Sequence, residues 1–144
     1  MFRGQYTYSI DSKSRVAIPV KLRKQLTPES NETFVMKQGT VRCIELYPLD
    51  QWQLHEEKLK KLNQFNPEHA KFLHMHLQNV FEDTLDNQSR ILIPQILLNH
   101  AGIEKDVLLI GLLERIVIWN PVIYTEYLNS SELPYEQLAA KVMG

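Results

Sequence analysis

The chain has 144 residues, 44% of them apolar, which is enough for one compact domain or two fused half-domains and excludes a disordered chain. No apolar run has the length of a signal peptide or approaches the roughly 20 residues of a membrane span, so we expect a cytoplasmic protein without a membrane partner. The net charge of −1 argues, as an average, against a nucleic-acid binder. The single cysteine, Cys43, excludes a disulfide framework and is expected in the core.

The charge is unevenly distributed along the chain. Residues 1–25 contain one acidic residue, Asp11, and six basic ones: Arg3, Lys13, Arg15, Lys21, Arg23 and Lys24. This segment has a net charge of +5, which leaves −6 for the other residues. Such asymmetry points to a polyanionic partner, although three of the cations could simply form the solvated face of a helix.

One sequence unit occurs twice in the chain. Residues 8–19 read YSIDSKSRVAIP, and 75 positions later residues 83–94 read DTLDNQSRILIP. The similarity continues beyond this motif, because Gly39 and Gly111 occupy matching places with an offset of 72. Each unit is too small to bury its own apolar faces, so we expect the two units to pair in one structure.

The first repeat begins with two predicted strands and a short helix. Residues 5–10 and 16–18 have strand patterns, and the polar turn between them predicts a β-hairpin. Pro19 suits the first turn of a helix that ends before Pro28. Its expected core contacts are Val20, Leu22 and Leu26.

Two further strands complete each repeat. In the first repeat they are predicted at residues 33–37 and 41–47, with a positive φ at Gly39 in the turn between them. The second repeat has the same order of elements: strands at 84–85 and 91–93, a helix led by Pro94 and ended by Gly102, and strands at 107–113 and 115–119.

Two amphipathic helices are predicted between the repeats. The first starts at a cap, Asp50, and has one apolar stripe: Trp52, His55, Leu59 and Leu62. The second is capped by Asn66 and has another: His69, Phe72, Leu73, His76, Leu77 and Val80. Tail helices from Asn120 to Met143 are too short to be stable alone, so we expect them to dock on a neighbouring element or subunit.

Asp11 and Arg15 bracket the first predicted turn. The carboxylate of an aspartate at the start of a turn accepts a hydrogen bond from the backbone N–H two residues later. The favoured interpretation of Asp11 is therefore that it only stabilises the turn. Arg15 at the mouth of the turn, with Lys13 at its tip, offers fork-shaped donors that suit phosphate or guanine. A two-stranded ribbon is also narrow enough to enter a major groove.

The second repeat keeps the turn but not its charge. Asp86 and Arg90 match Asp11 and Arg15, whereas Gln88 replaces Lys13, and residues 82–101 have a net charge of −2. The shared residues therefore indicate architecture, and the basic residues of the first repeat indicate the DNA surface. Arg90 is a weaker DNA candidate.

Catalytic and metal-binding signals are poor. The sequence has no phosphate-binding glycine loop, no nucleophile motif and no general base beside the Asp11–Arg15 pair, so we predict that it is not an enzyme and uses no cofactor. Among His69, His74 and His76, only the first and last share a helix face, two turns apart. An interior or interface role for His76 is favoured over zinc binding.

The chain has three features in common with one family of proteins. It opens with Met-Phe-Arg-Gly, it has two Asp-x-x-x-Arg motifs at 11–15 and 86–90 that are each followed by apolar-x-Ile-Pro, and it has Leu-Tyr-Pro at 46–48. In these features it resembles the bacterial MraZ proteins. The resemblance covers nearly the full chain. It implies an α+β fold of two pseudo-symmetric swapped-hairpin units of the SpoVT/AbrB type, which form a β-barrel-like core with helices outside. One departure is a serine, Ser14 and Ser89, before each motif arginine, where relatives often have glycine.

The resemblance also implies a function. MraZ proteins assemble as rings, bind promoter DNA, regulate the division and cell-wall gene cluster, and associate with the nucleoid. The expected DNA-binding residues here are Arg3, Lys13, Arg15, Lys21, Arg23 and Lys24, and the expected motif residues are Asp11, Arg15, Asp86 and Arg90. We expect a first unit at 1–49, a helical connector at 50–80, a second unit at 81–124 and a tail at 125–144.

Two alternatives stay open at this point. The chain could be an oligomeric scaffold that binds proteins through the helices of Trp52 and Phe72, with the basic segment serving solubility. It could also be an antitoxin-like DNA-binding module, although the duplication and the long central helices argue against this.

Overall fold

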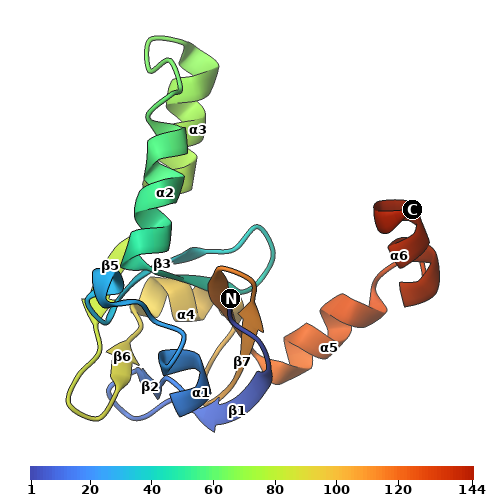
Figure 1. Ribbon diagram of the computed structural model, residues 1–144. Helices are drawn as coiled ribbons and strands as arrows, with labels where there is room; N and C mark the ends of the chain where they lie inside the picture. Colours follow the sequence, from blue (N-terminus) through green and yellow to red (C-terminus); the bar gives the residue numbers. More distant parts are fainter.

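The computed structural model describes residues 1–144 as eight strands, six α-helices and one 3₁₀ helix (Figure 1). The strands are β1 Gln5–Ser9, β2 Arg15–Ala17, β3 Thr33–Gln38, β4 Ile44–Pro48, β5 Phe81–Thr84, β6 Arg90–Leu92, β7 Asp106–Leu112 and β8 Arg115–Trp119. The helices are α1 Val20–Arg23, the 3₁₀ helix η1 Pro28–Ser30, α2 Leu49–Leu59, α3 Pro67–Leu77, α4 Gln95–Ala101, α5 Pro121–Asn129 and α6 Tyr135–Met143. None of these helices is both long and apolar enough to cross a bilayer.

Six strands form one open antiparallel sheet in the order β1-β7-β8-β4-β3-β5, and β2 pairs with β6 in a separate ribbon. When each strand is exchanged with its counterpart in the other repeat, the sheet order is simply reversed. The two repeats are therefore related by a pseudo-twofold axis that passes between β4 and β8. The predicted α+β class and the pairing of the repeats are confirmed.

Strand pairing crosses between the repeats. β1 bonds to β7, β5 bonds to β3, and the ribbon places Val16 opposite Ile91. The prediction that residues 5–10 and 16–18 pair with each other as a hairpin is wrong, because each of these strands finds its partner in the other repeat. Exchange of this kind lets two small units bury their apolar faces in one shared core.

The core lies between the inner face of the sheet and the layer formed by the ribbon, α1 and α4. Alternate residues of each strand point inward, as in Phe34 and Met36 of β3 or Ile116 and Ile118 of β8. Both repeats contribute to this single cluster of 18 buried residues. Truncation of a core residue such as Ile91, which is fully buried, should cost about 2–5 kcal/mol.

Helices α2 and α5 pack on the outer face of the sheet. Trp52 of α2 is buried against Tyr47, with ring centroids 5.5 Å apart, and Tyr124 of α5 contacts the buried Trp119. Cys43 lies in the second apolar cluster on this face, as expected of a small core residue. Burial raises the pKa of its thiol to about 12, which makes it a poor nucleophile.

Two helical projections leave the body in different directions. Helices α2 and α3 form an arm, which is at the top of Figure 1, and α5 and α6 form a tail at its right. The predicted cap is confirmed at Asn66, whose side chain accepts N–H bonds from the first turn of α3, and Asn120 caps α5 in the same way. Asp50 is not a cap, because α2 already begins at Leu49, and its carboxylate instead accepts a hydrogen bond from the Thr27 hydroxyl at 2.7 Å.

Three other local predictions need correction or refinement. The helix after Pro19 is a single turn, in which Leu22 is buried and Val20 is 52% exposed, so Val20 is not a core contact. Gly39 does not have a positive φ, in contrast to Gly102, which ends α4 with φ 65°. Gly39 is instead required by packing, since a Cβ there would collide with the Sγ of Cys43.

Candidate nucleic-acid interface

Asp11 organises the turn between β1 and β2. Its Oδ1 accepts the backbone N–H groups of Lys13 and Arg15, both at 2.9 Å, and its Oδ2 accepts Nε of Arg15 at 2.8 Å. Ser14 adopts the left-handed conformation with φ 62°. The backbone N–H of Arg15 is the largest of the contacts that hold the pKa of the Asp11 carboxyl below its ordinary value of 3.8.

The turn of the second repeat has the same geometry. Oδ1 of Asp86 accepts N–H groups from Gln88 and Arg90 at 2.8 and 2.9 Å, and Oδ2 accepts Nε of Arg90 at 3.0 Å. Ser89 has φ 58°, so both serines adopt the conformation that glycine would adopt most readily. The backbone N–H of Arg90 likewise lowers the pKa of Asp86.

The ribbon brings the two turns together. Ile93 donates its N–H to the carbonyl of Ser14, and Ile18 donates to the carbonyl of Ser89, both at 2.9 Å. The sequence separates the two motifs by 75 positions, but the fold joins them side by side across β2 and β6. All four motif side chains therefore belong to one cluster.

The cluster is asymmetric in how it uses its two arginines. Nη1 of Arg90 lies 3.5 Å from Oδ2 of Asp11, in addition to the bond from Nε to Asp86. Arg15 bonds Asp11 through Nε and makes no hydrogen bond through its terminal nitrogens. With 28% of its side chain exposed, Arg15 can present those nitrogens to a ligand.

Three of the predicted basic residues meet in one place. Arg3, Lys21 and Lys24 line an open hollow of about 580 Å³ beside β1 and α1, together with Met1, Gly4, Tyr6 and Gln25. No carboxylate lines this hollow. Arg3 comes from the segment before β1 and the lysines from the helix region after β2, so the fold creates a local positive field from separate elements.

The other predicted cations lie outside the hollow. Lys13 is exposed at the tip of the first turn, and Arg15 stands in the motif cluster. Arg23 is half-buried and donates Nε to the carbonyl of Ile18 at 3.0 Å, so it supports the chain before α1. Of the six predicted residues, Arg23 is the one whose guanidinium is committed to the protein's own backbone.

Gly111, which the sequence marks only as the counterpart of Gly39, has a supporting role that was not predicted. The N-terminal segment crosses β7 at this position, where Gly111 donates its N–H to Gly4 at 2.9 Å and Phe2 donates to Leu113 at 2.7 Å. A Cβ at Gly111 would collide with the backbone of Phe2 and Arg3. A glycine inside an apolar strand is a known signal of close backbone approach, and this one brings Arg3 to the hollow.

Four of the five histidines lie far from this surface, in the arm, and the fifth, His100, is on α4. Nε2 of His76 is 2.8 Å from Nε2 of His55 across α2 and α3, His69 accepts the N–H of Asn63, and His74 bonds Ala70. The structure contains no group of three or more His, Cys, Asp or Glu side chains that could hold a metal ion. His76 thus has the interior helix-to-helix position favoured for it.

Comparison with known proteins identifies the family. The model of a family described as "MraZ protein, putative antitoxin-like" matches residues 1–75 and 77–144. The chain belongs to the MraZ family. Two proteins named transcriptional regulator MraZ are similar to it over almost their whole lengths. The one from Clostridium tetani is 39% identical over 142 residues, which cover 99% of this chain and 96% of that protein.

The second relative, from Caldanaerobacter subterraneus, is 42% identical over 139 residues, covering 96% of this chain and 94% of that protein. The resemblance proposed from the paired Asp-x-x-x-Arg motifs is therefore confirmed. Membership of the MraZ family also confirms the prediction that the chain is not an enzyme.

Proposed function

We propose that this MraZ-family chain is a sequence-specific DNA-binding transcriptional regulator that acts on promoters of the division and cell-wall gene cluster. The observation that carries the proposal is the hollow of Arg3, Lys21 and Lys24, which contains no carboxylate although the chain as a whole is slightly acidic. Clustered lysine and arginine side chains neutralise phosphates, so duplex DNA fits this surface. The names of the relatives support the same function.

Within this proposal, Lys13 and Arg15 lie at the edge that enters the DNA groove. Arg15 is oriented by Asp11, which occupies Nε and leaves both terminal nitrogens for guanine or phosphate. A guanidinium held in this way loses less conformational entropy on binding than a mobile one. Arg3, Lys21 and Lys24 would contact phosphates and set the register on the duplex.

The second repeat has a structural role in the proposal. Arg90 bonds two aspartates, Asp86 and Asp11, and Gln88 stands where the first repeat has Lys13. Two nearby carboxylates offset the charge of this guanidinium and face two of its three nitrogens, Nε and Nη1, so Arg90 attracts DNA less than Arg15 does. The first repeat therefore supplies the ligand surface, and the second repeat supplies strand partners and holds the first turn in place.

Self-assembly completes the mechanism. The basic segment of one chain, residues 1–25 with a net charge of +5, is too small for tight DNA binding at physiological salt. When several copies are linked in a ring, binding of one segment raises the effective concentration of the others near the same DNA. We propose a homo-oligomeric ring in the cytoplasm, associated with the nucleoid, that contacts successive promoter repeats. Unit 1–49 would face DNA, while the connector 50–80, unit 81–124 and tail 125–144 support assembly.

A gel-shift titration with a promoter fragment of the cell-wall cluster tests the proposal. Arg15→Ala should remove promoter retention while the mass of the assembly stays unchanged, since a bidentate contact is worth about 1–3 kcal/mol at each site and the assembly repeats it. Arg42→Ala, at an exposed arginine outside the hollow and the ribbon, is the matched control and should bind as the wild type does. Equal binding by Arg15→Ala and wild type would refute the role of Arg15.

Salt dependence separates this function from a protein scaffold. The logarithm of DNA affinity should fall linearly with the logarithm of salt concentration, with a slope of about −0.9 for each phosphate contacted. Lys21→Gln and Lys24→Gln should each make that slope shallower by about 1. An affinity that barely changes with salt would favour the scaffold, whose interface would be apolar.

The family description also contains the term antitoxin-like. An antitoxin would form a stable complex with a second protein, so a toxin would co-purify with the tagged chain. Recovery of the chain as copies of itself alone, with promoter binding intact, favours the regulator.

A further inference from the structure

Helix α6 has an apolar face that nothing in its own chain covers. Tyr135, Leu138, Ala139 and Val142 follow the i, i+3, i+4, i+7 spacing of one helix face. No residue of α6 is buried, and Tyr135 and Val142 are 82% and 70% exposed. A helix of nine residues is marginal in water by itself, so its stability must come from docking.

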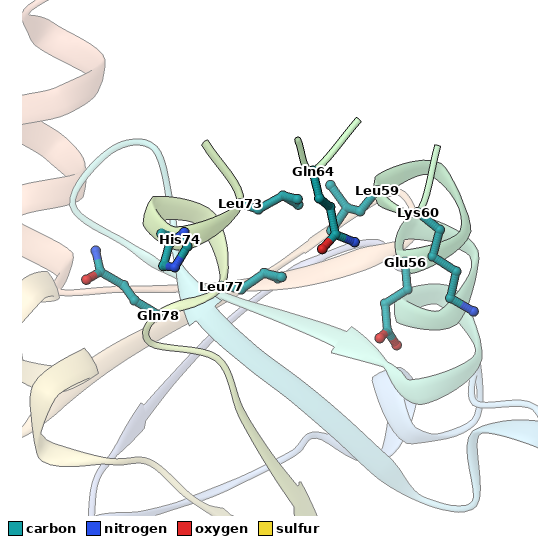
Figure 2. A pocket seen from close by; sticks show the side chains of 8 residues that line it. All are labelled: Glu56, Leu59, Lys60, Gln64, Leu73, His74, Leu77 and Gln78. Carbon is teal, nitrogen blue, oxygen red and sulfur yellow. The ribbon is translucent and has the colours of Figure 1, made fainter. Parts of the chain in front are cut away.

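The arm has a groove of matching character. It lies between α2 and α3, has a volume of about 480 Å³, and is lined by five polar residues and three leucines: Leu59, Leu73 and Leu77. Figure 2 shows Leu73 and Leu77 of α3 pointing toward the side of α2 and Leu59, with Gln64 between Leu73 and Leu59 and with Glu56 and Gln78 at the outer edges. A groove that offers leucines among polar side chains can receive the apolar face of an amphipathic helix.

Length agrees between α6 and the groove, and charge agrees only between the wider segments that carry them, because α6 (Glu136, Lys141) and the groove lining (Glu56, Lys60) are each neutral. At 1.5 Å per residue, α6 spans about 14 Å and the helices that border the groove about 16 Å. The tail from residue 120 to 144 contains three glutamates and one lysine, a side-chain charge of −2. The tip of the arm from residue 58 to 71 contains four lysines and one glutamate, a charge of +3. Opposite charges on the tail and the tip of the arm favour their approach.

The occupant is a second copy of the chain. Arm and tail project from different sides of the body (Figure 1), so α6 lies away from the groove of its own chain. We propose that α6 of one copy docks between α2 and α3 of the next. This inference rests on the ring of the proposed function and names its contact. The contact is heterologous, because a different surface is used on each copy, and its repetition closes a ring or extends a filament.

Complementary variants test the contact by light scattering. Leu138→Asp damages the tail and Leu73→Asp damages the groove, so each variant alone should have the mass of a protomer. An equimolar mixture should form dimers of twice that mass, because the intact tail of Leu73→Asp docks in the intact groove of Leu138→Asp. This outcome holds even if Leu73→Asp loosens its own arm, since its tail is separate.

Matched controls add the same charge elsewhere on the same helices. Gln137→Asp, off the apolar face of α6, and Met75→Asp, on α3 but outside the groove, should keep the mass of the wild-type assembly. Retained assembly by Leu138→Asp and Leu73→Asp, loss of assembly by either control, or a mixture that stays at protomer mass would each overturn the docking.

The same measurements distinguish this inference from the proposed function. A wild-type assembly that is unaffected by the tail and groove variants removes the contact but leaves the ring. A wild type that is a protomer at all concentrations removes both. Dimers from the mixture, combined with a wild-type assembly that does not bind promoter DNA, support the contact and contradict the DNA function.

Discussion

Arg90 of the second repeat approaches Asp11 of the first, with Nη1 3.5 Å from Oδ2, whereas no equivalent bond joins Arg15 to Asp86. The two Asp-x-x-x-Arg turns otherwise have the same hydrogen bonds, so the contact of Arg90 with Asp11 is what distinguishes them. It makes Arg90 part of the support for the first turn and leaves the terminal nitrogens of Arg15 without a partner in the chain. The two repeats thus depend on each other at the candidate DNA surface.

Replacement of the two aspartates should have unequal effects on stability. Asp11→Asn loses carboxylate contacts to Arg15 and Arg90, while Asp86→Asn loses a contact to Arg90 alone, so Asp11→Asn should unfold at the lower urea concentration at pH 7. Both carboxyls have lowered pKa values in the folded chain. Their stabilisation is therefore complete above the unfolded value of 3.8 and is lost as the pH falls through the lower folded value.

Urea titrations at pH 7 and below pH 3.8 check this prediction. The difference between wild type and Asp11→Asn should shrink progressively in acid, as the pH falls from 3.8 through the lowered folded pKa and the wild-type carboxyl becomes protonated. A difference that is the same at both pH values would contradict the charge-based account.

The left-handed serine at the first turn should be improvable. Ser14 has φ 62°, and this left-handed conformation costs a residue with a side chain about 1–2 kcal/mol. Replacement by glycine removes that cost, but the greater flexibility of glycine in the unfolded chain lowers stability by about 0.5–1 kcal/mol. Ser14→Gly should therefore raise the free energy of unfolding by up to about 1.5 kcal/mol. Ser12→Gly, at a residue of the same turn without positive φ, should lower it, and urea unfolding of the two variants compares them.

Gly111→Ala should weaken both stability and DNA binding. The added methyl collides with the backbone of Phe2 and Arg3, which cannot move aside without displacing Arg3 from the hollow, and such overpacking costs about 1–3 kcal/mol. Gly39→Ala, at the matching position of the first repeat, collides with Cys43 instead and should destabilise the fold without weakening DNA affinity. Equal DNA affinities of Gly111→Ala and wild type in a gel shift would contradict this link.

The contact between His55 and His76 should make the arm sensitive to pH. Burial is the main cause that lowers the pKa of both rings, and the positive charge of Lys37 on β3 lowers both further. For His55, Lys58 also lowers the pKa, while Glu45 and Glu56 partly offset these effects by raising it. Below pH 6.5, the ordinary pKa of histidine, the two rings are protonated in the unfolded chain but stay neutral in the folded chain. The free energy of unfolding therefore declines as the pH falls toward the folded pKa.

Urea unfolding at pH 7.5 and 5.5 measures this decline. His76→Gln removes one titrating ring and should lose less stability between these two pH values than the wild type. His74→Gln, on an exposed part of α3, should behave like the wild type. A decline of equal size in His76→Gln and the wild type would exclude the pair as its source.

Many local features were predictable from short segments. The caps at Asn66 and Asn120 and the left-handed Gly102 follow from side chains that bond their own backbone or lack a Cβ, so no distant partner decides them. Asp50 failed as a cap because a distant hydroxyl, that of Thr27, competes for its carboxylate. Val20 failed as a core residue because α1 is one turn long and presents only Leu22 inward.

The sequence by itself determined that this protein has two repeated units, where their strands lie to within a few residues, and that the first unit has the positive charge. These properties follow from periodicity, repetition and side-chain charge, which are local to the chain. The tertiary structure alone decided which strands pair, that Asp11 and Arg90 meet, and that Arg3, Lys21 and Lys24 share one hollow. An alternating pattern indicates that a segment is a strand, but not which strand it pairs with. The pairing is decided by burial of both repeats in one core, and the pairing in turn determines where the charged side chains lie.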